Sequence, residues 1–203
     1  MRQFYVLFKA NLISNLRNRA AVFFNLISPL MFFLIFGAIF SKSSSGGISY
    51  ILFLLAGVIV ANQIGTGLFG AAAVLVSWRE RGVFKRIQAT PMPVSNLILA
   101  RVFSQLVIVL LQAVVVIVVA QVVFHVHPVA AGAGWDVLFI LVGGLVFLAI
   151  GQLVASRARR VETANILINV LFFPLLFFTN LYFPISLMPD WLQHVGEVLP
   201  SYL

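Results

Sequence analysis

Five long runs of apolar residues constrain this chain more than any other feature. They cover roughly residues 20–41, 50–77, 95–124, 136–155 and 163–183. A helix needs about 20 mainly apolar residues to cross the hydrocarbon layer of a membrane. The runs are continuous, which favours helices over barrel strands, whose lipid-facing and lumen-facing residues alternate. The sequence therefore predicts an all-α polytopic membrane protein with five transmembrane helices.

Composition supports one transmembrane domain over residues 1–203 and argues against soluble classes. Of the 203 residues, 62% are hydrophobic and 9% are charged, whereas soluble domains carry about 25% charged residues. The net charge of +8 would suit nucleic acid, but the basic residues are dispersed between apolar runs, so no nucleic-acid partner is expected. The chain has no cysteine, which excludes a disulfide framework and a thiolate metal site.

The distribution of lysine and arginine predicts the orientation of the chain. Short cytoplasmic loops of membrane proteins carry the excess of these residues. In a five-span arrangement, twelve of the 13 Lys and Arg residues fall on one side, and only Lys42 falls on the other. The amino terminus is therefore predicted to lie in the cytoplasm and Leu203 outside.

The first 19 residues are basic and amphipathic. On a helical wheel one face carries Phe4, Phe8, Leu12 and Leu16, and the opposite face carries Gln3, Asn11, Ser14, Arg17 and Asn18. This pattern suits an amphipathic N-terminal helix in contact with membrane lipid at the cytoplasmic interface. A positive flank that only sets the topology would also fit.

Ionisable residues are nearly absent from the five runs. Such groups cost about 2.5–3.5 kcal/mol each on insertion scales and therefore tend to be functional. Arg101, a turn or two inside the third run, is expected to extend to the cytoplasmic surface. The histidines, at positions 125, 127 and 194, match no strong ligand spacing. We expect no catalytic residue, no metal site and no cofactor.

The segment GTGLFG at 65–70 matches the dinucleotide-binding pattern G-x-G-x-x-G, but its context is wrong. It lies inside an apolar run, not between a strand and a helix, and no acidic residue follows at the expected distance. Glycines here are expected to allow close helix packing. The sequence also lacks the P-loop pattern G-x-x-x-x-G-K-[ST], so the chain is not expected to bind ATP in that way.

The polar residues that remain inside the runs are neutral. In chain order they are Asn62, Gln63, Thr66, Gln105, Gln112, Asn165 and Asn169. Hydrogen bonding between helices, which contributes about 0.6 kcal/mol per pair in membrane proteins, is one interpretation. Lining a substrate path is the other, and its candidates are Asn62, Gln63, Thr66, Asn165 and Asn169. The residue pattern leaves both open.

A charged loop, residues 78–93, separates the second and third runs. Bases alternate with apolar residues, and the pattern predicts a short helix that lies flat on the membrane and is ended by Pro91 and Pro93. Arg79, Val83 and Ile87 are expected to share one face of it. Its charges suit a complementary partner surface, and a basic loop that only sets the topology fits as well.

The segment RERGVFKRIQATPMPVSNLILAR, residues 79–101, resembles the cytoplasmic loop of type-2 ABC exporter permeases, particularly the bacterial daunorubicin-resistance-like group. The order of parts agrees over essentially the whole chain. The resemblance implies that the loop forms a coupling helix docked on a separate ABC ATPase subunit. It assigns to that contact Arg79, Glu80, Arg81, Lys85, Arg86, Thr90 and Pro91.

The same resemblance implies a homo- or heterodimer with a second permease. It places the second and fifth spans beside the substrate path at the dimer interface, which favours Asn62, Thr66 and Asn169 as path residues. Members of that family have six spans and finish in the cytoplasm, whereas this sequence stops at LPSYL. We therefore expect that the sixth span is missing.

The function implied by the resemblance is that of a non-enzymatic permease subunit in a bacterial plasma membrane. It would export a drug, lipid or polysaccharide-type substrate by alternating access. An alternative from another class is a membrane scaffold or assembly factor that transports nothing and recruits a cytoplasmic partner through its basic loop. A neighbouring gene for a P-loop ATPase would separate the two.

Overall fold

The computed structural model describes residues 2–40, 44–45, 48–89, 93–125 and 133–177. In chain order the elements are α1 (Arg2–Arg17), α2 (Arg19–Val22), the π-helical segment η1 (Phe23–Ile27), α3 (Ser28–Phe40), β1 (Ser44–Ser45), β2 (Ile48–Ser49), α4 (Tyr50–Glu80), α5 (Val83–Gln88), α6 (Val94–Phe124), α7 (Ala133–Arg157) and α8 (Val161–Phe177). β1 and β2 pair antiparallel between α3 and α4. The all-α fold class is confirmed.

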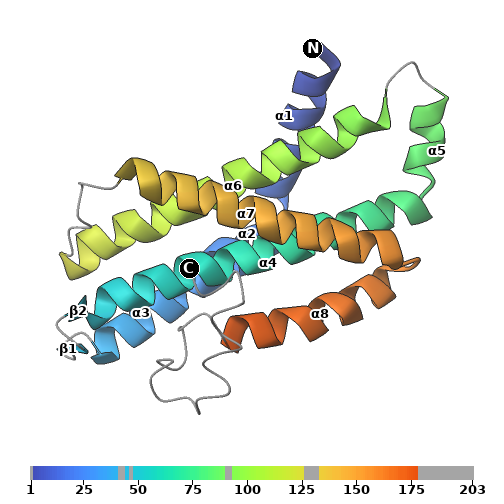
Figure 1. Ribbon diagram of the computed structural model, residues 1–203. Helices are drawn as coiled ribbons and strands as arrows, with labels where there is room; N and C mark the ends of the chain where they lie inside the picture. The colour runs from blue at the N-terminus through green and yellow to red at the C-terminus, as the bar shows by residue number, and fades with distance from the viewer. Residues whose placement is uncertain (1, 41–43, 46–47, 90–92, 126–132, 178–203) are drawn as a thin grey trace.

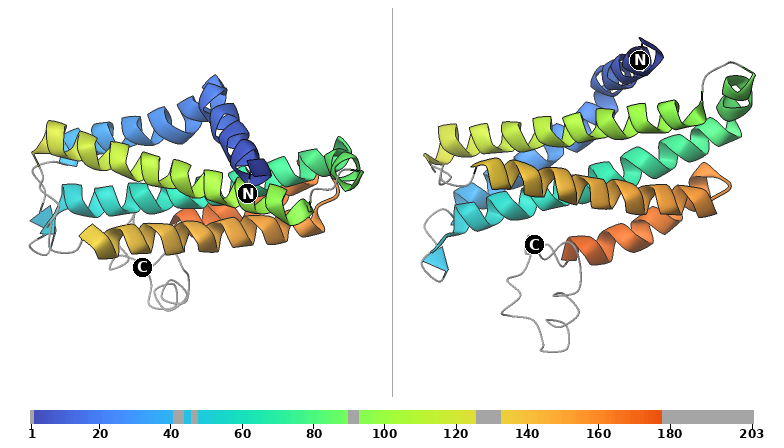
Figure 2. Two further views of the ribbon diagram at one scale, coloured as in Figure 1. Left: turned by 90° about the horizontal axis from the view of Figure 1, so that it is seen from above. Right: turned by 45° about the horizontal axis from the view of Figure 1, so that its top comes forward.

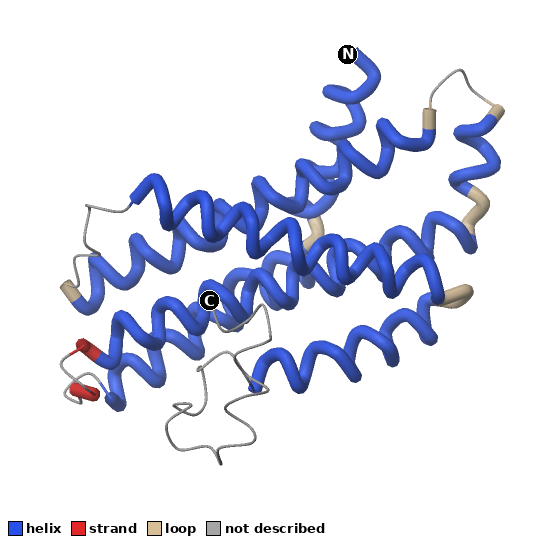
Figure 3. The backbone as a smooth tube through the Cα atoms, in the orientation of Figure 1, coloured by secondary structure: helices blue, strands red, loops and turns tan. Residues whose placement is uncertain are grey.

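The long helices form a bundle around α4. α4 contacts α3, α6, α7 and α8, and Figure 1 shows it running beside α7 in the same direction, while α6 and α8 run the opposite way. The α4–α6 connection, which includes α5, and the α7–α8 turn lie at one end of the bundle. The β1–β2 pair lies at the other end (Figure 3). One end therefore gathers the basic connections.

Three of the described helices are long and apolar enough to cross a membrane, namely Tyr50–Glu80, Val94–Phe124 and Gly134–Arg157. Phe23–Ile39 and Val161–Leu176 are shorter apolar helices at the positions of the first and fifth runs. The fifth run continues beyond the described residues. The count of five spans therefore stays a prediction.

The predicted amphipathic helix is present as α1, and it packs across α6 at an angle (Figure 2). Phe4 and Phe8 are half-buried, and the Phe4 ring meets that of Phe103 edge-on at 5.8 Å between centroids. Leu16 is 50% exposed and does not continue this contact. Part of the predicted apolar face thus packs against α6.

Glycines let α4 and α7 pack closely. A Cβ atom on Gly67 would lie 2.5 Å from the Cβ of Phe147, and one on Gly151 would lie 2.6 Å from the carbonyl oxygen of Gly67. Fully buried Ile64 and Leu68 fill the core beside this contact. The prediction that the glycines of GTGLFG allow close helix packing is confirmed at Gly67.

Candidate functional site

The predicted cytoplasmic helix exists as α5, but it is separate from Arg79. α4 continues through Glu80, and Gly82 then adopts a left-handed conformation with φ of 67° before α5 begins. Glycine adopts this conformation without the steric cost that a Cβ brings. The prediction that Arg79 shares a face with Val83 and Ile87 was wrong, because this glycine turns the chain between the two helices.

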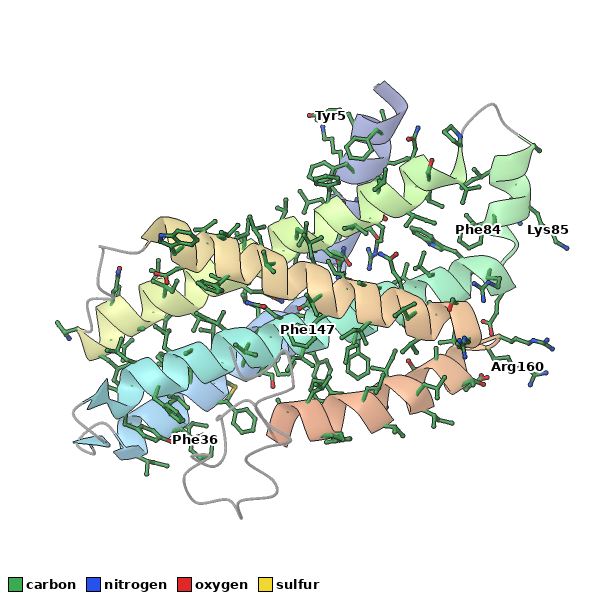
Figure 4. The ribbon with its side chains drawn as sticks, viewed as in Figure 1. Tyr5, Phe36, Phe84, Lys85, Phe147 and Arg160 are labelled. Carbon is green, nitrogen blue, oxygen red and sulfur yellow. The ribbon has the colours of Figure 1, made fainter. Side chains whose placement is uncertain are left out.

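α5 presents apolar and charged side chains on different sides. Phe84 packs against the core, whereas Lys85 and Arg86 are exposed, and Figure 4 shows Phe84 and Lys85 on opposite sides of the helix. Arg81, which precedes the turn at Gly82, is also exposed. These three cations form a basic surface at one end of the bundle.

Arg79 and Glu80 contact the turn between α7 and α8. Nη1 of Arg79 donates hydrogen bonds to the carbonyl oxygens of Ala155 at 3.1 Å and Ala158 at 3.0 Å. Oε1 of Glu80 accepts one from the backbone N–H of Val161 at 3.0 Å. The last carbonyls and first amides of a helix lack partners within it. Arg79 therefore caps the end of α7, and Glu80 caps the start of α8.

The seven residues predicted to contact an ATPase thus divide into groups. Arg79 and Glu80 have partners within their own chain, whereas the side chains of Arg81, Lys85 and Arg86 face outward. The remaining two, Thr90 and Pro91, lie outside the described residues.

A cavity of about 190 Å³ opens between η1, α3, α4 and α8. Its walls are mainly apolar and include Phe24, Phe32 and Phe172, and none of the described residues that line it is charged. Asn62 and Thr66 contribute polar groups from α4. Asn62 is 8% exposed, and its side chain has no hydrogen-bond partner among the described residues.

The other three predicted path residues lie elsewhere. Gln63 is buried and faces α7, where its Oε1 lies against Gly143. Asn165 and Asn169 are exposed on α8, and Nδ2 of Asn169 donates a hydrogen bond to the carbonyl oxygen of Asn165 at 2.8 Å. Of the five, the structure brings only Asn62 and Thr66 together at the cavity.

Two glutamines of α6 connect α4 with the N-terminal elements. Gln105 accepts a hydrogen bond from Nδ2 of Asn15 at 3.1 Å and donates one to the carbonyl oxygen of Thr66 at 3.3 Å. Gln112 accepts one from the Thr66 hydroxyl at 3.0 Å and donates one to the carbonyl oxygen of Asn25 at 2.9 Å. Hydrogen bonding between helices is thus confirmed for Gln105, Gln112 and Thr66.

Arg101 is buried, contrary to the expectation that it extends to the cytoplasmic surface. It is 6% exposed, and its Nη2 donates a hydrogen bond to the carbonyl oxygen of Gly70 at 2.9 Å. Its buried Nε has no partner in the described part of the chain. The expectation was wrong because Arg101 lies on the face of α6 that packs against α4.

The residue types that could bind a metal ion do not form a cluster in the described part of the chain. Exposed His125 follows the end of α6, and His127 and His194 lie outside the described residues. Within the described ranges, no three His, Cys, Asp or Glu residues lie together in a way that could hold a metal ion.

Comparison with known proteins decides the family. Residues 2–203 match the family described as "ABC-2 type transporter". The chain belongs to the ABC-2 type transporter family. A Bacillus subtilis (strain 168) protein named "Putative transport permease YvfS" is 29% identical over 187 residues, which make up 92% of this chain and 76% of that protein. No solved structure matches the chain. The resemblance seen in the charged loop is confirmed.

Membership of the ABC-2 family, together with the long apolar helices, makes this chain a membrane component of a transport system. Sequence reasoning located its charged loop and two of its cavity residues. It missed the capping roles of Arg79 and Glu80. The available signal was their charge, because the helix dipole favours an acidic residue at the start of a helix and a basic residue at its end. The sequence did not show which helix ends would lie nearby.

Proposed function

We propose that the chain is the membrane-spanning subunit of an ATP-driven exporter, with ATP hydrolysis on a separate ABC ATPase subunit. Family membership supports the transport role. The observation that carries the coupling to an ATPase is α5, which Phe84 anchors to the core while Lys85 and Arg86 remain exposed. Complementary charge on a partner would guide association and fix its orientation.

The orientation in this proposal places the end of the bundle with α5 in the cytoplasm of a bacterial cell. The amino terminus and the α7–α8 turn then face the same compartment. The asymmetry of Lys and Arg supports it, because cytoplasmic loops carry the excess of these residues. Substrate would move outward, away from the ATPase.

The cavity between α3, α4 and α8 is the proposed start of the substrate path. Its aromatic walls, and the amide of Asn62 that has no partner among the described residues, suit an apolar or amphipathic molecule, such as a drug or lipid, better than a polysaccharide. Ligand cavities commonly measure about 300–1,000 Å³, so a cavity of about 190 Å³ must widen to admit such a molecule. Movement of α8, or a second permease beside it, would widen it.

A second permease, identical or related, is part of this proposal. The outward side of α8 carries Ile166, Val170 and Phe173, each more than half exposed. Asn165 and Asn169 are exposed on the same helix. These apolar groups require lipid or protein as cover, and the amides would find hydrogen-bond partners at a protein interface.

Charge reversal on α5 tests the coupling. Surface substitutions usually change the free energy of unfolding by less than about 0.5 kcal/mol, whereas like charges at a docked interface cost several kcal/mol. The double variant K85E/R86E should therefore reach the membrane but fail to co-purify with its co-expressed ABC ATPase and fail to stimulate ATP hydrolysis. A reporter fused at Gln88 must show that the loop is still cytoplasmic.

The matched control reverses two cations at the same end of the bundle but outside α5. Arg159 and Arg160, in the α7–α8 turn, are both exposed. More ATPase should co-purify with R159E/R160E than with K85E/R86E. If K85E/R86E keeps its orientation, still binds the ATPase and still stimulates ATP hydrolysis, α5 only sets the topology of the chain. If the chain binds a cytoplasmic protein but moves no substrate, the result would instead favour the alternative that it is a membrane scaffold.

A further inference from the structure

We propose that Arg79 and Glu80 are positioning residues that carry movement of α5 to α8, and that they do not contact the ATPase. We call these two residues the corner pair. The inference rests on the proposed function, because it concerns how a push on α5 reaches the cavity. Only Arg81 and Gly82 separate the corner pair from α5.

Arg79 joins the end of α4 to the end of α7. The two helices run in the same direction (Figure 2), so both present carbonyl groups, and the negative end of the helix dipole, at this end of the bundle. The guanidinium of Arg79 reaches across to two of those carbonyls, at Ala155 and Ala158. The helix dipoles favour a cation at this end.

Glu80 makes the complementary contact with α8. Its carboxylate accepts a hydrogen bond from the N–H of Val161, the first residue of α8, where the helix dipole favours a negative charge. Two neighbouring side chains of opposite charge therefore meet two helix ends of opposite polarity. Both residues are exposed, but the hydrogen bonds of their side chains are made to backbone groups of the chain itself.

The turn held by the corner pair is short and fixed to the core. α7 ends at Arg157 and α8 begins at Val161, and Ala158 between them is fully buried in the core cluster. The turn cannot slide freely over the end of α4. Displacement of that end by α5 must therefore also displace the start of α8.

α8 extends this movement to the cavity. Ala164 and Ile168 are fully buried in the core cluster that α8 shares with α4, and Phe172 meets Phe69 edge-on at 5.5 Å between ring centroids. Phe172 and Leu176 then line the cavity. A tilt of α8 about its held end would move this wall of the cavity.

The test separates binding of the ATPase from movement of α8. The chain has no cysteine, so spin labels can be placed at Leu99 on α6 and Leu171 on α8, both exposed. The distance between the labels is measured with and without ATP in the complex with the co-expressed ABC ATPase. The wild type should change this distance on ATP binding, whereas R79A/E80A should retain the ATPase but lose the change and the transport.

Two sets of variants show that the capping contacts are responsible. R159A and E162A remove one cation and one carboxylate from the same turn region. No hydrogen bond of these side chains links α4 to the turn in the described part of the chain. Both variants should therefore show the same distance change on ATP binding as the wild type. E80Q keeps an oxygen that can accept from Val161 and should restore most of the distance change. If R79A/E80A is not monodisperse, the single variants R79A and E80A replace it in the test.

The outcomes distinguish this inference from the proposed function. Loss of the ATPase by R79A/E80A, while R159A and E162A retain it, would mean that the corner pair contacts the partner, and the inference would be wrong while the function stands. Normal movement of α8 and normal transport in R79A/E80A would also overturn it. If the wild type binds no ATPase at all, the proposed function fails and the inference fails with it.

Discussion

At Gly151 the absence of a side chain allows α7 to approach the backbone of α4. The space that a Cβ would need is occupied by the carbonyl oxygens of Gly67 and Leu68, which belong to a helix and cannot rotate away. Gly143 differs, because the atom nearest to it is the end of the flexible Gln63 side chain. The same substitution should therefore have different costs at these two positions on α7.

We predict that G151A lowers the free energy of unfolding by about 1–3 kcal/mol, the usual cost of overpacking. G143A should cost less, and G134A, which meets nothing within 4 Å, should cost nothing. Thermal unfolding of the purified proteins in one detergent would measure the order. An equal effect at all three positions would contradict the close approach of α4 and α7.

Residue types and spacing predicted the glycine contacts, because small residues inside an apolar run have few other roles. They did not predict Arg101, since the sequence gives the depth of a residue in a helix but not the face that meets a neighbour. Asn62 and Thr66 were predicted with Gln63, Asn165 and Asn169, yet only the packing of η1, α3 and α8 around α4 shows which of them line a cavity.

Among the elements, the joint between α4 and α5 depends on the backbone of one residue. Gly82 has a positive φ, and nothing lies within 4 Å of where its Cβ would be. A substitution there meets no steric obstacle outside its own backbone. Its effect should therefore arise from backbone conformation and from the direction in which α5 leaves α4.

We predict that G82A weakens ATPase stimulation, because an L-residue in this conformation costs roughly 1–2 kcal/mol. G82N is the matched control, since asparagine tolerates left-handed backbone better than other non-glycine residues. G82N should keep most of the stimulation, which is measured as ATP hydrolysis by the reconstituted complex. Equal activity in G82A and G82N would show that the direction of α5 is not important.

For the whole molecule, the placement of connections predicts a topology that can be measured directly. The α4–α6 connection and the α7–α8 turn share one end of the bundle, as the asymmetry of Lys and Arg predicted. Reporter fusions should read outside, inside, outside, inside and outside at Lys42, Gln88, Ala131, Arg159 and Leu203. A cytoplasmic reporter at Leu203 would contradict the five-span arrangement.

The buried guanidinium of Arg101 also bears on the order in which the chain enters the membrane. A cation exposed to lipid at the centre of an isolated helix costs about 2.5–3.5 kcal/mol on insertion scales, and Arg101 avoids lipid by donating to Gly70 of α4. α4 precedes α6 along the chain, so the carbonyl group of Gly70 is synthesised before the guanidinium of Arg101. We therefore expect α6 to enter the membrane beside α4, which would shield the charge of Arg101 from lipid during insertion.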